Sequence, residues 1–221
     1  MNLFDIIGPV MIGPSSSHTA GAARIGRAAL ALLGDRCVKA EIRFHGSFAK
    51  TYKGHGTDRA IIGGLLDMDA DDPRIRQSLQ IAEREGLEAD FGVISLTGAH
   101  PNTVQLNLTG ATGKNLAVRC ASVGGGGIRI DEADGIALGI SGQSDSLVIR
   151  HYDTTGVIAA VTGLLARAGI NIASIRDFRA AQGGQAVMTI ETDSPPSPEI
   201  LMELERTDAI ASVAFLARRS F

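Results

Sequence analysis

Alternation of apolar and polar residues over positions 38–45 is the clearest local pattern in the first half of the chain. The apolar members of this stretch are Val38, Ala40, Ile42 and Phe44. A period of two places their side chains on one face of a strand. Upstream, apolar residues over positions 17–33 recur with helical spacing, and Gly34 follows as a C-terminal stop signal. The pattern predicts a helix over 17–33 and a half-buried strand over 38–45.

Weaker patterns continue this mixture of helices and strands up to position 140. Residues 46–56 are rich in glycine and polar side chains, which predicts a loop. Thr57 or Asp58 is the expected N-cap of the helix that follows. Further elements are predicted as a helix over 75–85 and strands over 91–96, 104–109, 116–123, 128–130 and 136–140. We therefore predict an α+β fold with a mixed sheet, whose strand order the sequence leaves open.

The last third of the chain has a more regular pattern. Residues 141–146 are polar and turn-rich, and mark the expected domain boundary. Beyond them we predict strands over 147–150, 170–178, 186–192 and 212–217, with helices beginning near Val157 and after Ser197. The resulting order, βαββαβ, is that of a ferredoxin-like unit. We expect two domains, an N-terminal mixed α/β domain over residues 1–143 and a ferredoxin-like domain over residues 147–221.

Charge and composition exclude several classes of function. The formal net charge is −3 and the sequence pI is about 5.9, which leaves no basic footprint for nucleic acid or a membrane surface. Aromatic residues make up only 4% of the chain, and there is no Trp to stack on bases. No apolar run approaches the length of a membrane span. We expect neither a nucleic-acid partner nor a membrane.

Cysteine usage adds little chemistry. The two cysteines, Cys37 and Cys120, are far apart and form neither a disulfide framework nor a zinc motif. The sequence therefore predicts no metal site in this chain. The first residues carry Asp5 and no basic leader of the kind that begins a signal peptide. These features favour a cytoplasmic location.

The string GPSSSHTAG, residues 13–21, is the most unusual in the sequence. A Gly-Pro break followed by serines places hydroxyls where a helix begins, and such a terminus attracts anions. His18 lies one step further on and could move a proton to or from a bound anion. Simple helix capping explains one hydroxyl, whereas this turn carries four. We predict a pocket for the carboxylate of an amino acid, with capping as the alternative.

A second histidine, His55, lies between Gly54 and Gly56. Glycines allow the backbone to approach a ligand closely, which favours a functional role for His55 over a structural one. His100 and Asn102 are expected at a strand end, where an ordinary Asn/Pro turn is the alternative.

These strings together carry a resemblance to a known family. They are residues 13–21, 46–51, 54–58, 100–102 and 124–126. In these strings the chain resembles the separate beta chain of iron–sulfur-dependent L-serine dehydratases, and the resemblance covers nearly its whole length. Residues 147–221 resemble an ACT domain, a small module that senses amino acids.

The resemblance implies that L-serine loses water to form an enamine, which hydrolyses to pyruvate and ammonia. It implies no pyridoxal cofactor, but a 4Fe–4S cluster with one open iron site for the substrate hydroxyl. The cysteine ligands of the cluster are expected in an alpha chain, because Cys37 and Cys120 match no cluster motif. The chain is therefore expected to be active only with that partner.

The expected reaction assigns roles to the residues singled out above. A base must remove the α-proton of serine, and His18 and His55 are the candidates. The substrate needs fixed hydrogen-bond donors and acceptors. The candidate substrate-binding residues are Ser15, Ser16, Ser17, Thr19, Thr57, Asp58, His100 and Asn102.

The ACT resemblance implies an effector site. Relatives bind an amino acid at the turn before the first helix and at the start of the second strand, usually across a dimer. The corresponding residues here are Asp153, Thr155, Gly156, Asn171 and Ile172, with L-serine or a related amino acid as effector. A unit that only holds two copies of the chain together is the alternative. For the whole chain, the alternative to a catalytic subunit is a non-catalytic, amino-acid-binding regulatory or dimerisation protein.

Overall fold

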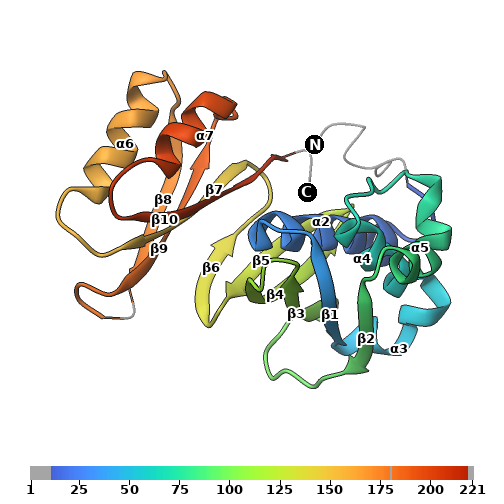
Figure 1. The fold of residues 1–221 in the computed structure, drawn as a ribbon. Coiled ribbons are helices and arrows are strands. Elements are labelled where there is room, and N and C mark those ends of the chain that lie inside the picture. The colour runs from blue at the N-terminus through green and yellow to red at the C-terminus, as the bar shows by residue number, and fades with distance from the viewer. Residues whose placement is uncertain (1–10, 180, 219–221) are drawn as a thin grey trace. The chain divides into compact units, whose positions relative to one another are not determined.

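A computed structural model describes residues 11–179 and 181–218 of the chain. The chain divides into two compact units, with the division after Gly142. Within the described residues, no helix has both the length and the hydrophobicity needed to cross a membrane. Each unit is described by itself below (Figure 1).

A six-stranded mixed sheet forms the centre of the first unit. Its strands are β1 (Cys37–Phe44), β2 (Glu88–Val93), β3 (Thr103–Gly110), β4 (Asn115–Gly124), β5 (Gly127–Ala133) and β6 (Ile136–Ile140). The order across the sheet is β2-β1-β3-β4-β5-β6, with β1 and β2 parallel and all other neighbours antiparallel. The predicted mixed sheet is confirmed. Because β1 lies between β2 and β3, the segment around residues 98–102 is a crossover connection and does not join neighbouring strands.

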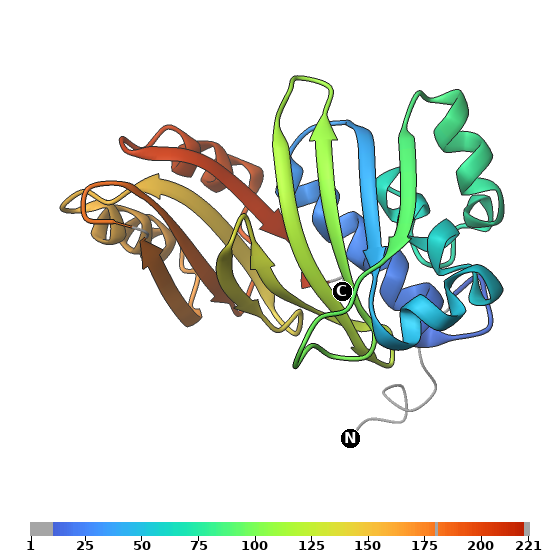
Figure 2. The same ribbon diagram turned by 90° about the horizontal axis from the view of Figure 1, so that it is seen from below.

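Helices cover one face of this sheet. They are η1 (Ser16–Ala20, a π-helical turn), α2 (Gly21–Leu33), α3 (Gly46–His55), α4 (Thr57–Leu65), η2 (Pro73–Gln77, a 3₁₀ turn) and α5 (Ser78–Arg84). The helix predicted over 75–85 is thus divided between η2 and α5. In Figure 2 the green strands pass in front of the blue helix α2. Burial alternates along β1 as predicted, with Ala40, Ile42 and Phe44 fully buried.

A close glycine contact joins α2 to α4. A Cβ atom on Gly26 would lie 2.3 Å from the carbonyl oxygen of Ile61, and one on Gly64 would lie 2.0 Å from the carbonyl oxygen of Ala23. The two backbones can approach this closely only because both positions lack side chains. This contact fixes the second half of α4 against the first half of α2.

The segment predicted as a loop, residues 46–56, is largely helical. Helix α3 runs to His55, and the buried ring of Phe48 packs edge-on against Phe44 at 6.3 Å between ring centroids. Tertiary packing of Phe48 outweighs the low helix propensity of the glycines. Gly56, with φ of +69°, ends α3 and is also the N-cap of α4, so the predicted capping by Thr57 or Asp58 is wrong.

The second unit has the predicted βαββαβ order. Its elements are β7 (Asp145–Tyr152), α6 (Val157–Arg167), β8 (Ile172–Arg179), β9 (Gln185–Thr192), α7 (Pro198–Glu205) and β10 (Ile210–Leu216). The sheet order is β10-β7-β9-β8, with all neighbours antiparallel. Its core combines Leu147 and Ile149 of β7 with Val161 of α6 and Leu204 of α7. The ferredoxin-like prediction is confirmed.

Candidate functional site

His18 lies in the π-helical turn that begins the first helix, and two hydroxyls hold its ring. Ser15 is the N-cap of this turn, and its side chain accepts the backbone N–H of His18 at 3.2 Å. The same Ser15 hydroxyl lies 3.3 Å from His18 Nδ1, and the Ser47 hydroxyl lies 3.3 Å from His18 Nε2. A hydroxyl can donate or accept a hydrogen bond, so both tautomers of His18 are accommodated. A widened π turn of this kind is frequent at functional sites.

His55 lies directly beside His18. The two ring centroids are 4.9 Å apart and the planes are nearly perpendicular, at 86°. Thr19, which is buried, donates its hydroxyl to the carbonyl oxygen of His55 at 3.4 Å. His55 Nδ1 is buried without a hydrogen-bond partner among the described residues. The structure therefore brings together the two histidines singled out in the sequence.

The surroundings of His18 favour its neutral form. Burial lowers the pKa of His18, and the neighbouring His55 charge lowers it further. A neutral imidazole has one nitrogen with a free lone pair and can accept a proton. The pair can therefore act as a base toward a small molecule.

The predicted serine and threonine donors do not all share one role. The Ser15 hydroxyl contacts the His18 ring, and the Thr19 hydroxyl donates to the carbonyl oxygen of His55. Both hydroxyls therefore position a histidine. Ser16 and Ser17 are half-buried, and their hydroxyls form no hydrogen bond to another described residue. These two remain available to a ligand. The hydroxyl of Thr57, fully buried at the first position of α4, also has no partner among the described residues.

Asp58 is half-buried in the first turn of α4. Its carboxylate accepts the backbone N–H of Arg59 at 2.8 Å. Burial is the main cause that raises the pKa of Asp58, opposed by that hydrogen bond and by the charge of Arg59.

His100 and Asn102 lie at the start of β3, on the crossover connection. The backbone N–H of Asn102 donates to His100 Nδ1 at 3.2 Å, within the segment itself. Between them, the Pro101 carbonyl accepts the backbone N–H of Ser47 at 2.7 Å. This places the segment against the beginning of α3, next to the hydroxyl that contacts His18. Gly46, at φ of +59°, leaves no room for a Cβ beside Pro101.

Two site residues were assigned no role from the sequence. Ser47 holds His18, and Ser122 lies so close to Gly21 that a Cβ there would be 2.2 Å from the Ser122 hydroxyl. That hydroxyl is buried and unpartnered among the described residues. The spacing of Phe48, Tyr52 and His55 is helical and could have revealed α3, and with it Ser47 in its first turn. No local signal marks Ser122, because its place follows from the pairing of β4 with β3.

The residues of this chain do not fit an iron–sulfur cluster. Cys37 and Cys120 are both buried, and burial raises the pKa of each thiol, that of Cys37 to about 11. A cluster ligand must be a thiolate, which these environments disfavour. Among the described residues, no three His, Cys, Asp or Glu side chains gather as a metal site.

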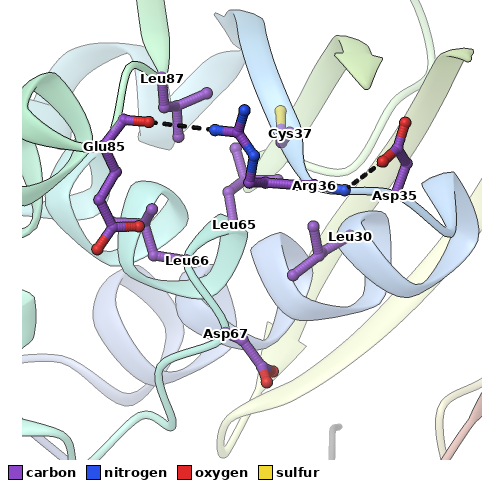
Figure 3. Close-up of a pocket in the computed structure, with 9 residues that line it drawn as sticks. All are labelled: Leu30, Asp35, Arg36, Cys37, Leu65, Leu66, Asp67, Glu85 and Leu87. Atoms are coloured by element: carbon purple, nitrogen blue, oxygen red, sulfur yellow. Dashed lines mark hydrogen bonds between the residues drawn. The ribbon is translucent and has the colours of Figure 1, made fainter. Parts of the chain in front are cut away.

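A pocket of about 370 Å³ lies at the other end of the first unit (Figure 3). It is lined by Leu30, Asp35, Arg36, Cys37, Leu65, Leu66, Asp67, Glu85 and Leu87. Helix α2 separates it from the imidazole pair by its length of 13 residues, about 20 Å. The Arg36 guanidinium donates to the Glu85 carbonyl at 3.1 Å. No histidine or hydroxyl lines this pocket, and its lining contains neither of the two histidines singled out in the sequence.

The predicted effector residues lie at two opposite ends of the second sheet. Asp153, Thr155 and Gly156 follow the end of β7, whereas Asn171 and Ile172 stand at the start of β8. Asp145 and Ile172 both pair with Thr192, so the start of β8 is level with the start of β7. The eight residues of β7 separate the two groups by roughly 20 Å or more. One copy of the unit does not bring them together.

Two of the three predicted polar effector side chains, Asp153 and Asn171, already have partners. The Asp153 carboxylate accepts from Arg179 Nη1 at 2.8 Å and from the Gly183 backbone N–H at 3.1 Å, and these bonds lower the pKa of Asp153. Asn171 donates to Asp193 at 2.5 Å. Thr155 is exposed, and Ile172 packs against the hydrophobic core of the unit.

Comparison with known proteins gives the same division of the chain. The sequence model of the serine dehydratase beta chain matches residues 2–133, and that of the ACT domain matches residues 146–209.

Individual relatives agree with these matches. The chain is 47% identical to the probable L-serine dehydratase, beta chain, of Bacillus subtilis (strain 168), over 98% of each chain. It is 37% identical to the L-serine dehydratase, beta chain, of Peptoniphilus asaccharolyticus, over 87% of each chain. A more distant relative is the D-3-phosphoglycerate dehydrogenase of Bacillus subtilis, at 26% identity over 79% of this chain and 33% of that protein. The chain therefore belongs to the serine dehydratase beta chain family, and its C-terminal unit is an ACT domain.

Proposed function

We propose that this chain is the beta subunit of a cytoplasmic L-serine dehydratase and supplies the proton-transferring and substrate-binding groups of a site shared with an alpha chain. The observation that carries the proposal is the pair of imidazoles, 4.9 Å apart, held by hydroxyls. The reaction converts L-serine to pyruvate and ammonia. It needs a base for the α-proton and a proton for the departing β-hydroxyl.

His18 and His55 are the two groups that carry out these proton transfers. The lowered pKa of His18 keeps one ring nitrogen free to accept a proton near neutral pH. The hydroxyls of Ser15 and Ser47 reorient when that ring changes protonation state, so the ring stays in place. His55, whose Nδ1 has no partner among the described residues, is the second candidate base or acid.

Hydroxyl groups near the two rings bind the substrate in this proposal. Ser16 and Ser17 are available donors for the carboxylate, and Thr57 is a further unpartnered hydroxyl beyond His55. His100 and Asn102 border the site from the crossover connection, and Asp58 lies at the start of α4. Ser15 and Thr19 act as positioning residues.

The 4Fe–4S cluster belongs to the alpha chain in this proposal, since the two cysteines here are buried thiols. When bound there, the cluster supplies a Lewis acid. This chain contributes only its own side chains to the shared site, and alone it has no activity.

The ACT domain binds L-serine as an effector between two copies of the chain. The two predicted groups, Asp153–Gly156 and Asn171–Ile172, stand at opposite ends of one sheet, so only a second copy could complete the site. A response of the thermal midpoint to L-serine tests this, and a response that survives Asn171→Ala would place the effector elsewhere.

Co-expression with an alpha chain under anaerobic conditions, followed by a pyruvate assay, tests the catalytic proposal. His18→Ala and His55→Ala are each expected to reduce kcat by about 10²- to 10⁴-fold, the usual range for a proton-transfer group. Full turnover in both variants would contradict the proposal and favour a regulatory, non-catalytic beta chain. Unchanged co-purification with the alpha chain shows that the variants still assemble.

A further inference from the structure

A second pocket, of about 220 Å³, lies beside His55 at the junction of α3 and α4. It is lined by Ile12, Gly13, Pro14, Thr19, Lys53, Gly54, His55, Gly56, Arg59, Ile75 and Arg76. Three of these residues are cationic, they come from α3, α4 and η2, and no carboxylate is among them. The pocket is smaller than the roughly 300–1,000 Å³ typical of sites for drug-sized ligands, so its ligand must be small.

The three cations differ from five arginines of the same unit. Arg27, Arg43, Arg74, Arg119 and Arg129 each form an ion pair with an Asp or Glu. Lys53, Arg59 and Arg76 form none among the described residues. The Asp58 carboxylate interacts electrostatically with Arg59 and Lys53, but among the described residues it forms no ion pair with either, and it does not line the pocket. The pocket thus gathers three cations without a carboxylate in its lining.

The helix start at the pocket adds to this charge. Helix α4 begins at Thr57, and its N-cap, Gly56, lines the pocket and provides no side-chain cap. The positive end of a helix dipole favours a bound anion. The glycines on either side of His55 allow a ligand to approach the backbone, since neither would place a Cβ within 4 Å of another group.

We propose that this pocket binds a small phosphoryl dianion, either inorganic phosphate or the phosphate group of a small ester. An amino-acid zwitterion fits poorly, because its ammonium group would lie among three cations. A phosphoryl group concentrates two negative charges and three acceptor oxygens on one centre, matching donors that converge from three elements. The ligand would contact His55 and Thr19, and would link the catalytic pair to the supply of a phosphorylated compound.

Titration of the ¹⁵N-labelled full chain with inorganic phosphate, at pH 8 and constant ionic strength, tests this. Saturable shifts of the Gly54 and Gly56 amide signals are expected. The double variant Arg59→Gln/Arg76→Gln should bind at least tenfold more weakly. The matched control is Arg74→Gln, which removes a charge from the same η2 turn, but one that is paired with Asp72 and does not line the pocket. It should bind within twofold of the wild type.

Titrations with other ligands distinguish a phosphate ester from free inorganic phosphate as the ligand. Tighter binding of glycerol 3-phosphate than of inorganic phosphate identifies an ester as the ligand, and the reverse identifies the free ion. Malonate binding as tightly as phosphate, an absence of saturation, or an equal loss in Arg74→Gln would each overturn the proposal. The measurement needs neither an alpha chain nor turnover, so its outcome is independent of the proposed catalytic function.

Discussion

Two histidines, one in each unit, show how partner chemistry decides what an imidazole can do. His18 lies between the hydroxyls of Ser15 and Ser47, both at 3.3 Å. His151, fully buried in β7, lies between two acceptors, with Nε2 at 2.9 Å from Asp177 and Nδ1 at 3.0 Å from the Tyr152 carbonyl. Neither partner of His151 is a hydroxyl that can switch between donating and accepting a hydrogen bond.

The comparison teaches that burial alone does not decide whether an imidazole is suited to proton transfer. Hydroxyl partners adapt to either protonation state, so His18 can exchange a proton at little structural cost. His151 instead holds β7 and β8 together through the contact of its Nε2 with Asp177. Three predictions test this contrast, in order of decreasing expected effect.

Matched substitutions of the two histidines should have opposite consequences. In the enzyme assembled with an alpha chain, His18→Asn is expected to lower kcat by about 10²- to 10⁴-fold with little change in thermal midpoint. His151→Asn should lower the thermal midpoint and leave kcat of the folded enzyme near the wild-type value. Pyruvate formation and thermal unfolding measure the two effects. An equal loss of kcat in both variants would show that the two histidines do not differ in their effect on turnover.

Removing the carboxylate partner of His151 should destabilise the second unit. Asp177→Asn is expected to lower the free energy of unfolding by about 2 kcal/mol, because a buried ring nitrogen loses its charged acceptor. Asp193→Asn is the matched control, since Asp193 bonds the exposed Asn171, and should cost less than about 1 kcal/mol. Urea unfolding and hydrogen exchange of the β7 amides measure the free-energy changes of both variants. Equal costs would mean that the His151 bond is no stronger than a surface contact.

The pH dependence of His18 should reveal its environment. Its folded pKa lies below the ordinary value of 6.5, mainly through burial and then through His55. The unfolded chain therefore binds this proton more readily, so the contribution of His18 to stability is present above pH 6.5 and is lost as pH falls through the folded pKa. NMR titration of the His18 ring measures the shift.

His55→Gln sharpens that measurement. Removing the neighbouring charge should raise the pKa of His18 part of the way toward 6.5, because burial, the larger cause, remains. A pKa of His18 that stays unchanged or falls in this variant would show that the two rings do not interact electrostatically.

The sequence predicted regular elements better than junctions. Strand β1 and the βαββαβ unit follow from alternation and helical spacing, which reflect the burial of one face of each element. Helix α3 was predicted as a loop because its glycines and polar residues lower helix propensity, and only the packing of Phe48 against Phe44 reveals why it forms. The N-cap of α4 was predicted at Thr57 or Asp58, whereas it is Gly56. Gly56 has a positive φ, which glycine adopts readily, and it both ends α3 and precedes α4.

By itself, the sequence determined the identities of the two imidazoles, the hydroxyl-rich turn around His18, and the order of the elements in the ACT domain. These depend on residue type and on contacts within a few positions, which local patterns record. Only the tertiary structure decided that His55 lies against His18, that Ser47 holds the ring, and that the two halves of the predicted effector site stand at opposite ends of a sheet. Strand order and the close glycine contact of α2 with α4 set those distances, and both join residues far apart in the chain, where a local pattern carries no information.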